Sequence, residues 1–183
     1  EVRNLYKIFG DEPEVALKLL AQGVDKDKIF EQTGMTVGVQ DASLSINEGE
    51  VFVGDTLFAM GCGRLFEGTA AQMFDNMRKL EKLPGETNVY CAHEYTLANL
   101  AFALAVEPEN PALTAFYLQA KQLRQQQQPT LPSTIARENA INPFLRCHTD
   151  GVKQAVATHC NHELNSHVDC FAALRNWKDG FSG

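Results

Sequence analysis

The sequence predicts an α+β fold, with short strands in the first half of the chain and mainly helices in the second. Two observations lead to this fold class. Apolar runs rich in β-branched and aromatic residues, at 51–53 and 87–91, are bounded by turn residues, as buried strands are. After residue 69, apolar residues recur at helical spacing between caps and prolines. With 183 residues, the chain can bury one good core and carry a helical extension.

The first 53 residues are expected to form strands around two short helices. Pro13 stands at a first-turn position after two acidic residues, and Gly23 ends this helix. Asp25 can cap the second helix, which ends near Gly34. The strands are expected at residues 1–9, 36–46 and 51–53.

Helices dominate the rest of the predicted structure. Thr69 is a plausible N-cap for the first of them, and Pro84 with Gly85 ends it. The glutamine run before Pro129 is most simply a solvated helix end. The expected helices cover residues 70–83, 95–106, 112–128, 151–160 and 166–178.

Composition and charge exclude several classes of function. The 44% apolar and 21% charged residues are ordinary for a globular protein. No signal peptide is visible, and no apolar run approaches the roughly 18 residues of a membrane span. The net charge of −7 argues against nucleic acid as a partner, so an anionic ligand would need a local basic cluster. Five cysteines, an odd number, suggest reduced thiols, and we expect a cytoplasmic protein.

Two polar residues follow the two apolar strands of the central region. Asp55 comes directly after strand 51–53, and His93 follows the strand that ends near Cys91. Loop residues at strand ends face solvent and collect ligands, and a carboxylate with an imidazole suits metal ligation. The pattern alone also permits a helix-capping aspartate and a hydrogen-bonded histidine.

Four stretches of the sequence resemble a known enzyme family. They are GDTLFAMGCGRLFEGT (54–69), YCAHEYTLANLAFALAVEP (90–108), PSTIARENAINPFLR (132–146) and ALRNWKDGF (173–181). Through them, residues 54–183 resemble the C-terminal half of bacterial glyoxalase II, or hydroxyacylglutathione hydrolase. The resemblance implies a partial metallo-β-lactamase-type sheet with a mostly helical C-terminal domain. It places a remnant of the hydrolase core at 54–108 and the helical domain at 109–183.

The same resemblance implies a metal-dependent thioester hydrolase. S-(2-hydroxyacyl)glutathione and water would give glutathione and a hydroxy acid such as lactate, through hydroxide held between two zinc, iron or manganese ions. Asp55 falls on the bridging carboxylate and His93 on one imidazole, so both are predicted catalytic residues and metal ligands. The family's THxHxDH and PGHTxGH motifs have no counterpart here. Zinc sites use at least three protein ligands, so we expect a hydrolase that is incomplete or inactive.

Five further residues fall on glutathione-contacting positions by resemblance. Glutathione has two carboxylates, so its pocket needs arginine, lysine and phenol groups. Arg175 and Lys178, at i and i+3, share one helix face and can converge on one anion. Alternatively, this pair is a solvated helix end favoured by the helix dipole. Phe66 departs from the tyrosine of some family members, which removes one hydroxyl contact. The five predicted substrate-binding residues are Arg64, Phe66, Tyr95, Arg175 and Lys178.

The opening 53 residues resemble a different family. They are similar to the start of an ABC transporter ATPase subunit of the glycine betaine/proline uptake type, ending before its Walker A loop. In that family, Phe9 would stack on adenine. No GxxxxGK[ST] motif follows Val53, so the phosphates of a nucleotide would have no cradle.

Two clusters of possible metal or nucleophilic residues have simpler explanations. His159, His162 and His167, with Cys160 and Cys170, look like a possible metal cluster. His162 and His167 are one residue too far apart for HExxH, so exposed histidines near helix ends are expected instead. Cys62 and Cys91 belong to motifs of a family that uses no catalytic cysteine, and core or turn roles are expected.

Three functions remain open from the sequence. The first is a glyoxalase II-like thioester hydrolase that binds a glutathione thioester. The second is a non-catalytic chimeric module that forms a homo-oligomer through an exposed sheet edge. The third, a nucleotide-binding fragment, is disfavoured by the missing phosphate loop.

Overall fold

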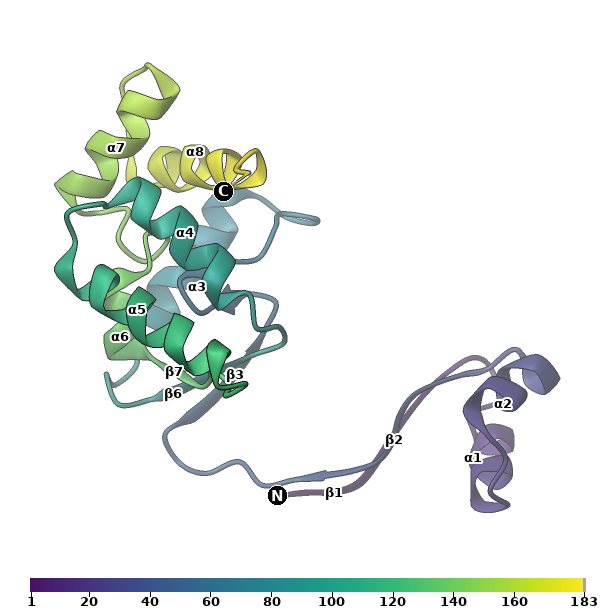
Figure 1. Cartoon of the computed structure of the whole chain (residues 1–183). Helices are drawn as coiled ribbons and strands as arrows, with labels where there is room; N and C mark the ends of the chain where they lie inside the picture. Colours follow the sequence, from purple (N-terminus) through teal and green to yellow (C-terminus); the bar gives the residue numbers. More distant parts are fainter. Residues whose placement is uncertain (183) are drawn as a thin grey trace. The chain divides into compact units, whose positions relative to one another are not determined.

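The computed structural model describes residues 1–182. It confirms the α+β class, with helices dominating after residue 69 (Figure 1). The chain divides into two compact units, the first spanning Glu1–Glu48 and the second beginning at Gly49. The three-domain division implied by the family resemblances stays a prediction. Within residues 1–182, every helix is too short or too polar to cross a bilayer.

The first unit is a strand pair with two helices between the strands. β1 (Val2–Phe9) pairs antiparallel with β2 (Thr36–Leu44). The connection holds α1 (Pro13–Ala21) and α2 (Lys26–Thr33). As predicted, the Asp25 side chain caps α2, accepting from the Asp27 amide at 2.9 Å. Ala16, Ile29 and Met35 form its small buried core.

The second unit contains a three-stranded sheet of order β3-β6-β7. β3 (Glu50–Gly54) runs parallel to β6 (Asn88–Cys91), and the crossover includes α3 (Ala70–Glu81). Thr69 and Gln72 form a capping box at the start of α3, in agreement with the predicted cap. The sequence does not predict β7 (Ser133–Thr134), which pairs antiparallel with β6, or a small hairpin of β4 (Leu57–Phe58) and β5 (Gly61–Cys62).

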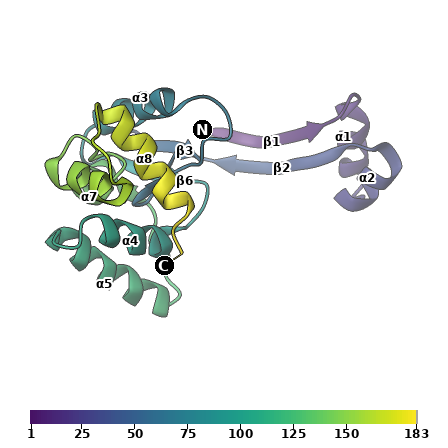
Figure 2. The same ribbon diagram turned by 90° about the horizontal axis from the view of Figure 1, so that it is seen from above.

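Five helices follow the parallel pair. They are α4 (Thr96–Val106), α5 (Pro111–Gln125), α6 (Ile135–Ile141), α7 (Asp150–Cys160) and α8 (His167–Asp179). Figures 1 and 2 show α4 and α5 side by side. The larger buried cluster includes Val89 of β6, Met77 of α3 and Phe171 of α8, so the helices cover one face of the sheet. A second cluster, around Leu100 and Leu113, joins α4 to α5.

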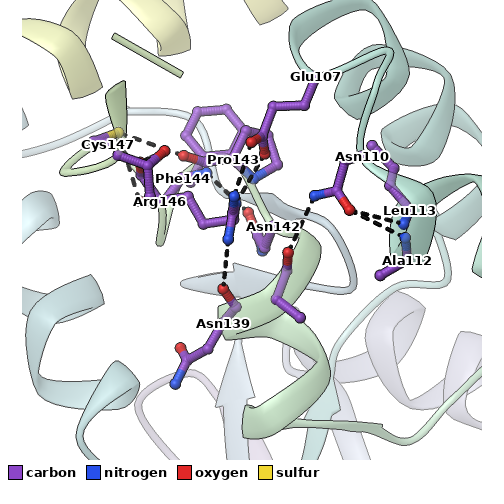
Figure 3. A network of polar contacts seen from close by, with 12 residues as sticks. Glu107, Asn110, Ala112, Leu113, Asn139, Asn142, Pro143, Phe144, Arg146 and Cys147 are labelled. Atoms are coloured by element: carbon purple, nitrogen blue, oxygen red, sulfur yellow. Dashed lines mark hydrogen bonds and ion pairs between the residues drawn. The ribbon is translucent and has the colours of Figure 1, made fainter. Parts of the chain in front are cut away.

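A polar network ties the turn between α4 and α5 to α6 (Figure 3). Glu107, the C-cap residue of α4, accepts two hydrogen bonds of 2.9 Å from Nε and Nη2 of Arg146. Arg146 Nη1 also donates to the Asn139 carbonyl at 3.3 Å. Asn110 caps α5 and donates to the Ala140 carbonyl at 3.2 Å. The network therefore fixes α6 and the residues after it against the α4–α5 pair.

Candidate functional site

The parallel pairing of β3 and β6 brings the predicted metal-binding side chains together. The carboxyl ends of parallel strands meet at one edge of a sheet, where ligands commonly bind. Gly54 is the register partner of Cys91, and the Ala92 amide donates to the Gly54 carbonyl at 3.0 Å. Just beyond these strand ends, Asp55 Oδ1 lies 3.7 Å from His93 Nε2. Both side chains are more than half exposed, so a ligand can reach them.

Aromatic rings surround His93 on its loop. The His93 ring stacks on Tyr95 with centroids 5.1 Å apart, and Phe58 meets Tyr95 edge-on at 5.2 Å. Glu94, which lies between His93 and Tyr95 in the sequence, is hydrogen-bonded to another segment. Its Oε1 accepts from the amide and the hydroxyl of Thr130, at 3.0 and 2.8 Å. These contacts fix the loop that carries His93 and Tyr95.

A cavity of about 520 Å³ lies at this end of the sheet. All seven residues predicted for the site line it, contributed by the β3 exit, the segment after β5, the His93 loop and α8. The structure thus brings together residues that are distant in the sequence, such as Asp55 and Arg175, which are 120 positions apart. Their roles in binding and catalysis stay predictions.

Three cations share the cavity with Asp179, a residue that the sequence analysis does not single out. Asp179 Oδ1 lies 3.1 Å from Arg175 Nη2 and 3.5 Å from Arg64 Nε. Lys178 neighbours the same group on α8. With Asp55 included, three positive side chains and two carboxylates line the cavity, which leaves an excess of one positive charge there, although the whole chain has a net charge of −7. This is the local basic cluster that an anionic ligand would need.

Arg175 is held inside the protein. It is only 5% exposed, and its Nη1 donates to the Cys62 carbonyl at 2.8 Å. Its guanidinium also lies over the Phe144 ring, 5.1 Å from the centroid. Helical spacing predicts that Arg175 and Lys178 share a face, but it does not predict that Arg175 is buried and already hydrogen-bonded. The guanidinium of Arg175 therefore has a fixed position in the cavity wall.

Lys178 keeps its amine at the cavity. The Nζ atom donates to the Ala98 carbonyl at 3.4 Å and lies over the rings of Phe102 and Phe181. Burial lowers the pKa of Lys178, and the nearby Arg175 and Arg64 lower it further, while Asp179 opposes them. Its positive charge is therefore lost at a lower pH than that of an ordinary lysine.

The aromatic residues predicted for glutathione contact are accessible. Phe66 is 84% exposed and Tyr95 is 49% exposed. Phe66 has no hydroxyl, so of these two only Tyr95 can donate a hydrogen bond to a bound carboxylate or amide.

The described residues do not complete a metal site. Asp55 and His93 offer one carboxylate and one imidazole, whereas zinc sites use at least three protein ligands. Within residues 1–182, no group of three or more histidine, cysteine or acidic side chains is close enough to hold a metal ion. The donor set of this chain alone therefore does not fit the zinc, iron or manganese pair that the family resemblance implies.

The clustered histidines and cysteines near α7 and α8 lie in separate surroundings. The His159 ring stacks on Trp177 with centroids 4.0 Å apart, and His162 Nδ1 lies 3.3 Å from the Cys160 carbonyl oxygen. His167 contacts Phe74 instead, with centroids 6.5 Å apart. Cys170 is buried in the core.

Cys62 and Cys91 differ in accessibility. Burial raises the pKa of the Cys62 thiol to about 12, although Arg175 opposes the shift. A thiol with this pKa is not an activated nucleophile at neutral pH. The half-buried Cys91 thiol lies 3.2 Å from the His93 carbonyl oxygen, and burial raises its pKa too. Both placements agree with the expected core and turn roles.

A buried carboxylate bonded to the β4–β5 turn, Glu138, is not predicted from the sequence. Glu138 on α6 is fully buried and accepts hydrogen bonds from the Met60 amide at 2.9 Å, from Asn142 Nδ2 at 2.8 Å and from the Ser133 hydroxyl. The only sequence signal is its place in the family-like motif PSTIARENAINPFLR. Burial raises the pKa of Glu138 above its ordinary value, and the three hydrogen bonds oppose this shift.

We expect Glu138→Gln to remove a pH dependence of stability. Since the folded pKa of Glu138 is raised, its contribution to stability is complete below the unfolded value near 4.5 and is lost as pH rises through the folded pKa. The glutamine variant lacks this loss. Its free energy of unfolding relative to wild type should therefore increase as pH rises above about 4.5. Urea unfolding from pH 4 to 8 measures it, and a difference independent of pH would contradict this assignment.

Comparison with known proteins gives one consistent family. Residues 94–181 match the family described as hydroxyacylglutathione hydrolase C-terminus. The chain is similar to the hydroxyacylglutathione hydrolase of Nitrosomonas europaea, with 51% identity over 136 residues, 74% of this chain and 52% of that protein. It is also similar to the proteins of the same name from Photobacterium profundum and Aliivibrio salmonicida. These are 44% identical over 174 residues and 51% identical over 158 residues.

The extents of these matches differ along the chain. The Photobacterium profundum match covers 93% of this chain and 68% of that protein, and the Aliivibrio salmonicida match covers 84% and 62%. The chain thus spans about half to two-thirds of the length of these relatives. No comparison supports the predicted ABC transporter resemblance of residues 1–53. The Photobacterium profundum match, which covers 93% of this chain, extends well into that segment.

Proposed function

The chain belongs to the hydroxyacylglutathione hydrolase family, and we propose that it binds the glutathione portion of an S-(2-hydroxyacyl)glutathione in the cavity beside Asp55 and His93. Thioester hydrolysis, giving glutathione and a 2-hydroxy acid, is then the reaction that this site serves. Support comes from the similarity to relatives that are longer than this chain, and from the charged and aromatic residues that line the cavity.

The positive excess in the cavity is the observation that carries the proposal. Glutathione has two carboxylates, and Arg64, Lys178 and Arg175 supply cationic donors within one cavity. Arg175 is fixed by its bond to Cys62, whereas Arg64 and Lys178 are more accessible. Tyr95 and Phe66 can contact the peptide backbone and apolar parts of the ligand.

Asp55 and His93 would place the thioester end of the ligand. The Asp55 carboxylate and the His93 imidazole are both possible metal ligands, and they lie 3.7 Å apart at the cavity. We propose that they contribute to a metal centre whose other ligands come from outside this set. Hydrolysis by residues 1–182 alone is therefore expected to stay near the uncatalysed rate.

Binding of S-methylglutathione, a thioether that cannot be hydrolysed, tests the proposal by isothermal titration calorimetry. Lys178→Ala should weaken binding about tenfold, or about 1.4 kcal/mol, because a half-buried charge facing the ligand is lost. The matched control is Lys79→Ala, which removes the same charge from a surface ion pair of α3 with Asp75. It should leave the affinity unchanged. Wild-type protein that does not bind the thioether, or equal loss in both variants, would contradict the proposal.

One observation favours the alternative of a non-catalytic, oligomerising module. β3 is an outer strand of its sheet, and Phe52 on it is 52% exposed and stacked on Tyr90 at 4.9 Å. The outer edge of β3 can add a strand from a second copy, and the exposed Phe52 would contribute apolar area to such a contact. A dimer in sedimentation velocity that does not bind the thioether would favour this alternative. The unpaired state of all five cysteines supports a cytoplasmic location in either case.

A further inference from the structure

The β4–β5 hairpin forms part of the cavity wall. Phe58 of β4 and Cys62 of β5 line the cavity, and Gly63 and Arg64 follow directly. Phe58 also contacts Tyr95 edge-on and lies 6.3 Å from the His93 ring centroid. The position of this hairpin therefore sets the shape of the site.

The hairpin has a turn that is poorly suited to hold it. Phe58 pairs with Gly61, which leaves Ala59 and Met60 as a two-residue loop. The turns favoured in such loops need a positive φ at both positions or a glycine at the first. Here Met60 has φ of 58° and Ala59 is not among the residues with positive φ. A bulky side chain in this region is strained, so the hairpin needs support from outside.

Buried side chains of α6 and α4 give that support. Asn142, the C-cap residue of α6, donates through Nδ2 to the Gly61 carbonyl at 3.1 Å and the Phe58 carbonyl at 3.4 Å. Asn99 of α4 donates to the Ala59 carbonyl at 3.0 Å. The Met60 amide is bonded to the Glu138 carboxylate, as described above.

Asn142 is itself held in one orientation. Its Oδ1 accepts from the Phe144 amide at 3.0 Å, and its Nδ2 lies 2.8 Å from Glu138 Oε2. The amide group therefore cannot flip without placing an oxygen against a carboxylate. Asn142 and Glu138 share α6 with the network of Figure 3, so the support is continuous with the α4–α5 pair.

Contacts of the hairpin extend to the Asp55 backbone. A Cβ built on Gly63 would lie 2.1 Å from the Asp55 carbonyl oxygen, so only glycine allows this approach. The Gly63 amide also donates to the Thr56 carbonyl at 3.2 Å. A shift of the hairpin would thus move the residues around Asp55, and through Phe58 the surroundings of His93.

We infer that Asn142 is a positioning residue of the site: its side-chain amide holds the β4–β5 hairpin where the glutathione thioester binds. Asn142 does not line the cavity, so it acts through the hairpin and not on the ligand. The inference rests on the proposed function for its effect on binding. Its effect on the hairpin can be measured without any ligand.

The experiment compares Asn142→Ala with Val156→Ala, which removes buried volume from α7 away from the cavity. Both variants should be less stable than wild type. At a temperature well below unfolding, only Asn142→Ala should weaken S-methylglutathione binding, by about tenfold. In the free protein, amide NMR resonances of Met60, Gly61 and Gly63 should shift in Asn142→Ala and stay in Val156→Ala. Should Asn142→Ala not fold, Asn142→Ser replaces it, since its hydroxyl keeps a polar group near the Phe144 amide.

The outcomes separate the inference from the proposed function. Wild type that does not bind the thioether would refute the proposed function, and the hairpin resonances would then decide the inference alone. Unshifted hairpin resonances in the Asn142 variant would overturn the inference, because its role would be stability only. Shifted resonances with unchanged affinity would overturn it as well, since the hairpin would not govern binding.

Discussion

Arg146→Ala is expected to lower the free energy of unfolding by about 3 kcal/mol, because it leaves the Glu107 carboxylate without its partner. The Glu107 side chain is only 10% exposed and accepts both of its hydrogen bonds from Arg146 (Figure 3). It is also the C-cap residue of α4, where the helix dipole disfavours a negative charge. Both effects raise the free energy of the folded variant relative to its unfolded state. Urea unfolding at pH 7 measures the loss.

The matched control for this prediction is Arg78→Ala. Arg78 pairs with Glu81 at 2.6 Å on α3, where both side chains are more exposed than Arg146 and Glu107, and an i,i+3 helical pair contributes about 0.5 kcal/mol. The double variant Glu107→Ala/Arg146→Ala should be less destabilised than the sum of its two single variants, since neither group is then left alone. Equal losses in Arg146→Ala and Arg78→Ala would show that the network of Figure 3 does not stabilise the fold.

Arg175→Ala is expected to impair both stability and binding. Removing the guanidinium leaves the buried Cys62 carbonyl without its donor, and we expect a loss of about 2 kcal/mol, to which the loss of the pair with the 41% exposed Asp179 adds little. The contact with the Phe144 ring is lost as well. Binding of S-methylglutathione should weaken by at least tenfold at temperatures where the variant is still folded, because Cys62 and Asp179 line the cavity.

Comparison with Lys178→Ala makes the prediction specific. Lys178 makes one long hydrogen bond, to the Ala98 carbonyl. Lys178→Ala should therefore change the free energy of unfolding by less than about 0.5 kcal/mol. Arg175→Lys retains the charge but not the planar fork that reaches Cys62 and Asp179 together, so most of the stability should remain lost. Full stability in Arg175→Lys would mean that charge alone matters at this position.

The parts of the fold that depend on local sequence were predictable. β3 and β6 are short apolar runs, and the helix caps at Asp25 and Thr69 are local signals. The meeting of Asp55 and His93 could be anticipated because both follow strands. The pairing direction, on which their approach depends, is a property of the folded chain.

Other features depend on partners far away in the sequence. The β4–β5 hairpin has no favourable turn residues, and its polar groups are bonded to Glu138 and Asn142, about 80 positions later. Helical spacing places Arg175 and Lys178 on one face, but packing against Cys62 decides that Arg175 is the buried one. Asp179 is not predictable as a site residue, because an acid near two bases is typical of an ordinary surface helix end.

The bond between Arg175 and Cys62 joins residues 113 positions apart, and this separation bears on the order of folding. Contacts distant in sequence form slowly, because a long loop must close before they gain any stability. The neighbouring helices α4 and α5 make local contacts and can associate early. We therefore expect the cavity to be one of the last features to form. A chain still emerging from the ribosome would have Asp55 and His93 available long before α8 completes the wall beside them.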